Sequence, residues 1–341
     1  MPTLTGGRAA ATINRELLPV TPVLARLGWD ESTPVPSGLE PARVVAQHRG
    51  ALVVTAESGE RVATLAGRLL HSAEPPPAVG DWVALGPGDV VAAVLPRHGT
   101  LRRADPGGAT EPQVLAANVD LALIVTGLDR DLNERRIERW LALALDSGVE
   151  PLLVLSKADL HPDPAGVAEA WSVRGGAAVV AISSRTGAGL DELKAQLAPA
   201  RTAVLLGSSG AGKSTLVNAL LGEDRQATAP VRASDDRGRH TTTRRELIVL
   251  PGGALLIDTP GLRLPRLWEP SATDGGGFAD LEELAGNCRF ADCRHDREPG
   301  CAVREQVSPE RLRHWEKLAR ERAWMEERLS LIHISEPTRP Y

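Results

Sequence analysis

The chain has 341 residues, of which 42% are hydrophobic, and it carries 39 Lys and Arg against 44 Asp and Glu for a formal net charge of −5. This length predicts two or three domains, and the net charge excludes a general electrostatic attraction for nucleic acid. Because no apolar run is long enough to cross a bilayer and residues 1–26 lack the apolar core of a secretion signal, we expect a cytoplasmic protein without membrane attachment.

The N-terminal third predicts an extension followed by a small β-domain. Residues 1–40 are rich in Pro and Thr, with one short helix expected near residues 17–27. In residues 41–110, short runs of apolar and β-branched residues are separated by glycines, which predicts a Greek-key barrel of the OB (oligonucleotide-binding) type as an RNA-binding domain. The expected strands are Arg43–Ala46, Ala51–Thr55, Val62–Leu65, Asp81–Leu85 and Asp89–Leu95.

Basic residues around this barrel are the candidates for RNA contact, through phosphates and the shape of the RNA. Stacking on bases is not favoured, because Trp82 is the single aromatic residue of the segment and we expect it in the core. The candidates are Arg43, His48, Arg49, Arg97, Arg102 and Arg103, with an arginine-rich segment further along the chain.

Residues 111–270 alternate strand and helix patterns, which predicts a parallel, doubly wound α/β sheet. The first helix of this segment has one apolar face made by Ile137, Leu141 and Leu145. The expected strands are 121–125, 151–155, 177–182, 203–206 and 254–257, and the expected helices are 133–146, 165–172, 190–197 and one following the glycine-rich segment at 207.

That glycine-rich segment fits the phosphate-loop pattern G-x-x-x-x-G-K-[ST] and stands between a predicted strand and a predicted helix. Its backbone N–H groups would face phosphates at the positive end of the helix. Lys213 is placed to reach the β- and γ-phosphates, and Ser214 offers a hydroxyl to Mg²⁺. A glycine-rich turn without nucleotide is the alternative. The nucleotide-binding residues expected here are Gly207, Ser208, Ser209, Gly210, Ala211, Gly212, Lys213, Ser214 and Thr215.

A second phosphate-side segment, Asp258-Thr-Pro-Gly261, follows an apolar strand. The Asp258 carboxylate can hold Mg²⁺ directly or through water, and the Gly261 N–H can meet the γ-phosphate. Between the two motifs lies the polar, arginine-rich segment 225–245, where one threonine of Thr241–Thr243 can ligate Mg²⁺ when the γ-phosphate is present, as in a switch loop. An ordinary mobile loop is the alternative.

The residue after Gly261 is Leu262, whose apolar side chain cannot polarise the attacking water as a Gln would. His240, in the arginine-rich segment, is the best candidate in its place. A structural or RNA-facing role for His240 is the alternative.

The guanine-reading segment comes before the phosphate loop, although in ordinary GTPases it follows. Lys157 can pack over the base, and Asp159 can accept hydrogen bonds from the guanine N1–H and N2 amine, which favours guanine over adenine. Ser156 stands where the common pattern has Asn, and the companion segment contributes Ser183 and Ser184 one β-α unit later. The order of these motifs predicts a circularly permuted GTPase.

All three cysteines lie close together near the C-terminus, with one histidine among them. Three thiolates and an imidazole at this spacing predict a closed, tetrahedral, structural Zn²⁺ site made by Cys288, Cys293, His295 and Cys301. Three free thiols brought together by chance are the alternative. The pattern Ser308-Pro-Glu310 predicts the start of a helix that runs to about residue 328, with a solvated face.

The last residues need a separate interpretation. Leu329-Ser-Leu-Ile-His-Ile-Ser-Glu-Pro-Thr-Arg339 reads like a translated adapter from a DNA-sequencing library, and we expect residues 329–341 to be a non-native tail. A genuine polar tail is the alternative. The expected domains are therefore an extension (1–40), an OB barrel (41–110), a GTPase domain (111–270), a zinc-binding helical domain (271–328) and this tail.

Taken together, these residues resemble the RsgA (YjeQ) family, the circularly permuted, ribosome-dependent small-subunit GTPases of bacteria. The resemblance covers about residues 41–328. It is carried by Val79-Gly-Asp-Trp-Val83, Asn118-Val-Asp120, the permuted order of the GTPase motifs, Gly238-Arg-His-Thr-Thr-Thr243 and the cysteine cluster.

The resemblance implies that the three domains clamp onto the 30S subunit, which stimulates hydrolysis of GTP to GDP during late 16S rRNA maturation and release of assembly factors. It also implies GTP, Mg²⁺ and one Zn²⁺ as cofactors, and we expect a monomer. Implied catalytic residues are His240, Lys213 and Thr242; the implied magnesium ligands are Ser214, Thr242 and Asp258. Ser156 departs from the family's Asn.

Two other classes of protein remain open from the residues alone. A nucleotide-gated RNA-binding scaffold would bind RNA in a nucleotide-dependent way without releasing phosphate. A phosphate-loop ATPase or kinase with an accidental Lys157-Ala-Asp159 would prefer ATP to GTP, although the sequence shows no motif for a kinase substrate pocket.

Overall fold

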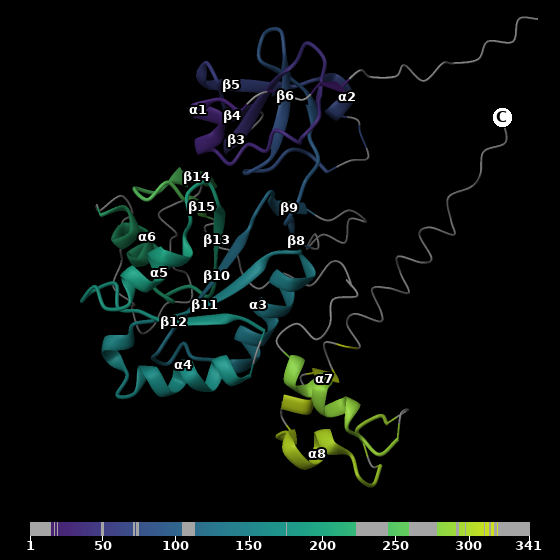
Figure 1. Cartoon of the computed structure of the whole chain (residues 1–341), viewed down its shortest axis with the longest axis vertical. Coiled ribbons are helices and arrows are strands. Elements are labelled where there is room, and N and C mark those ends of the chain that lie inside the picture. Colours follow the sequence, from purple (N-terminus) through teal and green to yellow (C-terminus); the bar gives the residue numbers. More distant parts are fainter. Residues whose placement is uncertain are drawn as a thin grey trace, which may run out of the picture.

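The computed structural model places a barrel at one end, an α/β sheet in the middle and a small helical unit at the other end (Figure 1). None of the described helices is long and apolar enough to span a membrane. The structure describes residues 15–16, 18, 20–48, 51–70, 72, 75–103, 113–174, 176–222, 245–258, 278–290, 293–296, 298–309, 311–313, 315–316 and 319.

The barrel closes on itself through five strands. The first strand pairs with both the second and the fourth, and the third and fifth strands pair in parallel, as in an OB barrel. Alternate side chains, among them Val44, Val54, Val83 and Val91, fill its interior. The expected barrel is therefore confirmed, and its strands are β3 (Glu40–His48), β4 (Ala51–Ala56), β5 (Gly59–Leu65), β6 (Trp82–Gly86) and β7 (Val90–Val94).

The α/β sheet has the order β12-β11-β10-β13-β15-β14, and all neighbours are parallel except β14 and β15. The antiparallel strand β14 was not expected from the sequence; it also pairs with β3 at Glu246 and Ala46, which joins this sheet to the barrel. The strands are β10 (Leu121–Gly127), β11 (Glu150–Ser156), β12 (Ala178–Ala181), β13 (Thr202–Leu206), β14 (Glu246–Val249) and β15 (Leu255–Asp258).

Helices cover both faces of this sheet because alternate residues of β10 point to opposite sides. Ala122 and Ile124 join the core that contains Trp140 of α3, whereas Leu123 packs in a second core with Leu216 of α6. The doubly wound expectation is confirmed. The helices are α3 (Glu134–Asp146), α4 (Pro164–Val173), α5 (Leu190–Gln196) and α6 (Lys213–Leu221), with a short 3₁₀ turn η1 at Ala158–Leu160.

Shorter elements complete the N-terminal half. The expected N-terminal helix is present but brief, and Pro22 at its start follows the capping residue Thr21, which accepts a hydrogen bond from the Leu24 N–H at 3.3 Å. These elements are β1 (Arg15–Glu16), α1 (Pro22–Arg26), β2 (Val35–Pro36), α2 (Gly67–Leu70), β8 (Leu101–Arg103) and β9 (Gln113–Ala116).

A buried arginine joins the barrel to the α/β sheet. Arg43 is only 2% exposed. Its guanidinium donates to the Gly80 carbonyl at 3.0 Å, the Asn118 carbonyl at 3.1 Å, the Thr202 hydroxyl at 2.9 Å and the Leu27 carbonyl. Those acceptors come from the barrel, from the chain ahead of β10, from β13 and from the end of α1. A single side chain therefore holds four segments together.

Burial lowers the pKa of Arg43 to about 10, against the opposing effect of Asp120 and Asp81, so the guanidinium stays charged at neutral pH. Trp82 lies under it, with its ring centre 5.2 Å from the guanidinium carbon, and Trp82 also packs edge-on against Trp29. Trp82 is thus a core residue, as expected.

Two of the expected RNA contacts are wrong. Arg43 is buried in the junction just described, because its rigid, planar guanidinium carries five N–H donors and can satisfy several buried acceptors at once. Arg97 makes a bidentate ion pair with the fully buried Asp81, at 2.7 and 2.6 Å, and its side chain is only 14% exposed. His48 and Arg102 remain predictions; Arg49 and the side chain of Arg103 lie outside the described residues.

The C-terminal unit is built from α7 (Ala279–Gly286) and α8 (Ala302–Gln306). Ser308 begins the next helical segment as expected, since its hydroxyl accepts the Arg311 N–H at 3.3 Å. The rest of that helix, to residue 328, and the tail lie outside the described residues or are described only in part.

Arg311 does not lie on a solvated face: its guanidinium donates to Asp280 of α7 and, at 2.7 Å, to the buried Glu138 of α3. This contact ties the C-terminal unit to the α/β sheet.

We expect Arg43→Met to lower the free energy of unfolding by about 3 kcal/mol or more, because the buried acceptors at the junction lose their donor. Arg61→Met is the matched control: Arg61 pairs with Glu40 and Asp89 at the surface of the same barrel, with its side chain 28% exposed, and its loss should cost less than about 1 kcal/mol. Urea unfolding of both variants followed by tryptophan fluorescence measures the two costs. Equal costs would contradict the junction's role in stability.

Candidate functional site

The candidate nucleotide site lies at the carboxyl ends of three neighbouring parallel strands. In the paired register, Gly127 at the end of β10 lies opposite Ser156 at the end of β11, and Ile124 lies opposite Leu206 at the end of β13. The phosphate loop begins at the next residue, Gly207. The register therefore brings the phosphate loop and the guanine-reading segment to the same edge of the sheet.

Glycines shape the phosphate loop at two points. Gly207 has a φ of 139°, and a Cβ there would lie 2.2 Å from the Val125 carbonyl oxygen. Gly212, with a φ of 91°, forms the N-cap of α6 in the left-handed conformation. These two positions let the chain curl from β13 into α6, so Ser214 and Thr215 lie in the first turn of that helix, where backbone N–H groups are available to phosphates.

Lys213 lies over the phosphate loop. Its ammonium donates to the carbonyls of Gly207 at 2.9 Å and Ser208 at 2.5 Å. Burial lowers the pKa of Lys213, and the nearby carboxylates of Asp258 and Asp131 oppose that shift. The buried Asp258, at the end of β15, therefore lies within electrostatic reach of the lysine, on the side where a magnesium-binding carboxylate is expected.

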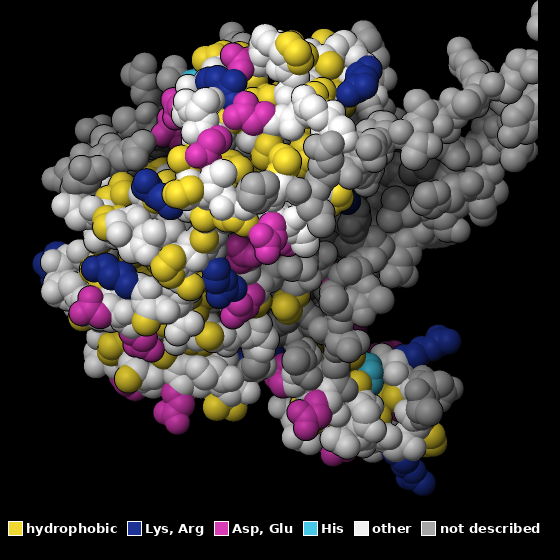
Figure 2. All heavy atoms as spheres, turned by 45° about the horizontal axis from the view of Figure 1, so that its top comes forward, with side chains coloured by type: hydrophobic (Ala, Val, Ile, Leu, Met, Phe, Trp, Pro, Cys, Tyr) yellow, Lys and Arg dark blue, Asp and Glu magenta, His cyan; other side chains and the backbone are white. Residues whose placement is uncertain are grey.

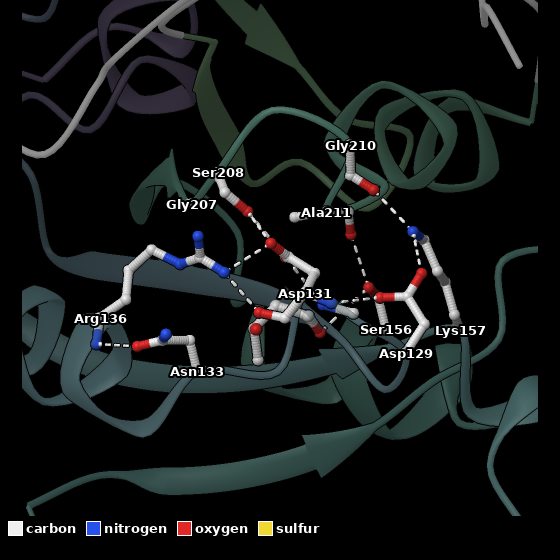
Figure 3. Close-up of polar contacts among 12 residues, drawn as sticks. Asp129, Asp131, Asn133, Arg136, Ser156, Lys157, Gly207, Ser208, Gly210 and Ala211 are labelled. Carbon is white, nitrogen blue, oxygen red and sulfur yellow. Dashed lines mark hydrogen bonds and ion pairs between the residues drawn. The ribbon is translucent and has the colours of Figure 1, made fainter. Parts of the chain in front are cut away.

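The guanine-reading segment contacts the phosphate loop directly (Figure 3). The Ser156 hydroxyl lies 2.6 Å from the Ala211 carbonyl oxygen and 3.1 Å from the Thr126 carbonyl oxygen. Because a hydroxyl has one proton, its stronger hydrogen bond is donated to the nearer acceptor, Ala211. The Lys157 ammonium donates to the Gly210 carbonyl at 2.7 Å, with Lys157 itself in the left-handed conformation at a φ of 58°. A serine at position 156 thus still links the two motifs.

Asp159 lies in η1 and meets the companion segment. Its carboxylate accepts the Ser183 hydroxyl at 2.6 Å and the Arg185 guanidinium at 2.8 Å. The hydrogen bond from Ser183, supported by Arg185, holds the pKa of Asp159 below its usual range, so the side chain is an acceptor at neutral pH. Ser184 is in the same turn as Ser183. The structure therefore brings these base-side candidates together.

The sequence reasoning missed three residues at this site. Asp129 accepts the Lys157 ammonium at 2.7 Å, Asp131 accepts the Ser208 hydroxyl at 2.6 and 2.7 Å, and Arg136 pairs with Asp131 at 2.6 Å (Figure 3). The available signal was the run Asp129-Arg-Asp-Leu-Asn133 between a strand and a helix, whose alternating acidic residues suit a tight turn ending in an N-cap. Asn133 does cap α3, accepting the Arg136 N–H at 3.0 Å.

The remaining candidates cannot be placed. His240, Thr241, Thr242 and Thr243 of the arginine-rich segment, and Gly261 with its neighbour Leu262, lie outside the described residues. Their roles in catalysis and in magnesium binding stay predictions.

The cysteine cluster is assembled as expected. The Sγ and ring-nitrogen atoms of Cys288, Cys293, His295 and Cys301 all lie within 4.8 Å of one another, and the cysteines are free of disulfides. The His295 Nδ1 atom is 3.6 Å from Cys288 Sγ and 3.4 Å from Cys301 Sγ, and those two sulfurs are 3.9 Å apart. Tetrahedral zinc, with Zn–S bonds of about 2.3 Å and Zn–N bonds of about 2.0 Å, requires edges near these lengths. The donor set therefore fits a metal ion of this kind.

Local structure supports that cluster. Cys301 caps α8 with its sulfur, and Cys288 follows the end of α7, so two helices hold two of the donors. His295 has a φ of 60°, an uncommon conformation for a residue other than glycine, and its ring lies 5.2 Å from that of Trp315. In this conformation the imidazole of His295 lies beside the sulfur atoms of Cys288 and Cys301.

Comparisons with known proteins identify relatives of this chain. The model of the RsgA GTPase family matches residues 94–268. A small ribosomal subunit biogenesis GTPase RsgA from Opitutus terrae is 48% identical over 339 aligned positions, which cover 91% of this chain and 92% of that protein.

Two solved structures share the fold. The crystal structure of YjeQ from Thermotoga maritima matches with a TM-score of 0.60 and 26% identity, over 84% of this chain and 99% of that one. YloQ, described as a circularly permuted GTPase, matches with a TM-score of 0.55 and 23% identity, over 86% of this chain and 96% of that one. The permuted order read from the motifs is confirmed, and the chain belongs to the RsgA family of GTP hydrolases.

Proposed function

We propose that this GTPase binds the 30S ribosomal subunit and hydrolyses GTP during late 16S rRNA maturation and small-subunit assembly. The observation that carries the proposal is the direct contact of the base-reading segment with the phosphate loop, through Ser156 to Ala211 and Lys157 to Gly210. A site of this kind can recognise both ends of one nucleotide. The ribosomal partner is taken from the name of the relative described above, a small ribosomal subunit biogenesis GTPase.

In this proposal each described residue has one task in binding GTP. The loop from Gly207 to Thr215 holds the phosphates with its N–H groups, and Lys213 turns its ammonium from the loop carbonyls to the β- and γ-phosphates. Asp159 accepts the guanine N1–H and N2 amine, while Ser183 and Ser184 support the base from the companion turn. Lys157 lies against the face of the base, held by the Gly210 carbonyl.

Magnesium, when bound, neutralises charge that develops on the phosphates. Ser214 and Asp258 would hold it, with Thr242 as the ligand that joins when the γ-phosphate is present. We assign the positioning of the attacking water to His240, because Leu262 cannot polarise it. The Asp258 carboxylate is suited to this task because it lies near Lys213 at the end of a buried strand.

The C-terminal cluster is proposed to hold one structural Zn²⁺. Three cysteines and one histidine would supply all four ligands of a tetrahedral ion, which would leave no position for a substrate water. The ion would fasten α7 to α8, and Arg311 fastens this unit to α3.

We also propose that recognition of 16S rRNA, and of assembly factors bound with it, is local. On the face seen in Figure 2, Lys and Arg side chains are interspersed with Asp and Glu rather than gathered into one basic patch. Of the barrel candidates, His48 and Arg102 remain for phosphate contacts. The protein would act as a cytoplasmic monomer, with the domain boundaries expected from the sequence.

Phosphate release from GTP and ATP, with and without purified 30S subunits, tests this function. We expect turnover selective for GTP that 30S raises by at least about tenfold, equivalent to about 1.4 kcal/mol of barrier. Lys213→Ala, which removes the ammonium from the phosphates, should abolish the stimulated turnover. Turnover indifferent to 30S would contradict the ribosomal partner, and nucleotide-dependent 30S binding without phosphate release would favour a scaffold.

Asp159→Asn should weaken GTP binding by at least about tenfold, because an amide offers one donor and one acceptor to an edge that needs two acceptors. Binding of xanthosine triphosphate, whose base carries a carbonyl in place of the amine, should improve. Fluorescence titration with labelled nucleotides measures both. Asp191→Asn, at an exposed site of α5, is the charge-matched control and should change neither affinity. Unchanged GTP affinity in Asp159→Asn would place the base elsewhere.

Removing the metal should unfold the C-terminal unit and leave the nucleotide site intact. We expect one zinc per chain by elemental analysis, and its loss in Cys288→Ser together with faster proteolysis after residue 278, since structural zinc contributes folding energy. GDP affinity should stay within about twofold of the wild type, because the cluster makes no described contact with the phosphate loop. Full resistance to proteolysis without bound metal would contradict a structural role.

A further inference from the structure

The loop between β10 and α3, residues 128–133, makes a hydrogen bond to the phosphate loop. Asp131 accepts the Ser208 hydroxyl on both carboxylate oxygens, at 2.6 and 2.7 Å, the lengths of hydroxyl–carboxylate bonds strengthened by charge. In Figure 3 the Ser208 side chain points away from the loop and toward Asp131. The carbonyl of the same Ser208 accepts the Lys213 ammonium. Ser208 is therefore held by its side chain on one side and bonded to the lysine on the other.

The carboxylate that holds Ser208 is itself fixed. Arg136 of α3 pairs with it at 2.6 Å and also donates to the Asp131 carbonyl. The Gly127 N–H, from the end of β10, lies 3.3 Å from the other oxygen, and the Asp131 N–H donates to Asp129 at 2.9 Å. These bonds come from a strand end, a turn and a helix. Asp131 can therefore hold Ser208 in one position with little freedom of its own.

The negative charge of Asp131 is unfavourable beside a phosphate-binding loop. It lies beside a loop proposed to bind a polyanion, and like charges repel. Arg136 offsets that repulsion by pairing with the carboxylate, which leaves Asp131 as a hydrogen-bond acceptor with little net charge. A Ser208 bond alone could be made by an uncharged acceptor. The pair of Asp131 and Arg136 instead supplies a strong bond to a rigid support without a net negative charge beside the phosphates.

We propose that Asp131 is a positioning residue for GTP binding, which acts through the Ser208 hydroxyl and holds the phosphate loop in the shape that receives the phosphates. Arg136 orients the Asp131 carboxylate and so contributes to the same positioning of Ser208. The inference rests on the proposed assignment of residues 207–215 as the phosphate site. Because the loop meets phosphates that GDP and GTP share, the affinity for both nucleotides depends on it.

A double-mutant cycle in the full-length protein tests the proposal. GDP and a non-hydrolysable GTP analogue are titrated against the wild type, Ser208→Ala, Asp131→Ala and the double variant. We expect each single variant to weaken both nucleotides by at least about tenfold, as for loss of a hydrogen bond to a charged group, and the double variant to be no weaker than the weaker single variant. Arg136→Met should weaken binding less, since Asp131 keeps its bond to Ser208.

The controls separate positioning from damage to the fold. Glu134→Gln removes a nearby carboxylate, in the first turn of α3, where Glu134 pairs with Arg174 at 3.1 Å, and it should leave affinity unchanged. Binding stoichiometry near one and a melting temperature within a few degrees of the wild type show that a variant is folded. A variant in which fewer molecules bind nucleotide, but those that bind do so with unchanged affinity, would indicate a merely structural role and overturn the proposal.

The remaining outcomes are distinct. Weak binding in Asp131→Ala with normal binding in Ser208→Ala would overturn the route through the hydroxyl. Additive losses in the double variant would do the same. Failure of the wild type to bind either nucleotide, or binding unaffected by Lys213→Ala, would instead contradict the phosphate site, and so the proposed function.

Discussion

The pairing of β10 with β11 on one side and β13 on the other is the constraint on which the nucleotide site depends. In a permuted chain the guanine-reading segment and the phosphate loop cannot be placed by the usual order of the motifs. Register replaces that order: it sets Ser156 opposite Gly127 and brings Gly207 against the carbonyl of Val125. At this separation the side chains of Ser156 and Lys157 reach the carbonyls of the phosphate loop and so join the two motifs. The permuted order still brings the two motifs together because parallel strands have their carboxyl ends at one edge, whatever the order of connection.

Arginine side chains make polar contacts at three points where parts of the protein meet. Arg43 joins the barrel to the sheet, Arg311 joins the C-terminal unit to α3, and Arg136 joins α3 to the loop that holds Ser208. The guanidinium groups of Arg43 and Arg311 each bind acceptors from more than one segment, which an apolar contact could not do with the same directional specificity. Helix α3 takes part in two of these contacts, two residues apart, and so lies between the C-terminal unit and the phosphate loop.

Several features were predictable because they depend on short stretches of sequence. The barrel strands followed from alternating apolar residues between glycines, the phosphate loop from its spacing, and the cap at Ser308 from a residue whose side chain bonds to a nearby N–H group. The cysteine cluster followed from the rarity of its residues. The roles of Arg43 and Arg97 did not, because a basic residue has the same appearance in the sequence whether it faces RNA or a buried acceptor.

The sequence by itself determined the family, the order of the motifs and the candidate residues for phosphate, base and metal, because each depends on residue type at a fixed spacing. Only the tertiary structure decided which polar residues support them. Asp129 and Asp131 reach Lys157 and Ser208 across 28 and 77 positions. Strand β14 reaches the barrel through one residue pair. Contacts at such separations are set by strand register and helix packing, and these depend on the burial of the whole core rather than on any local pattern.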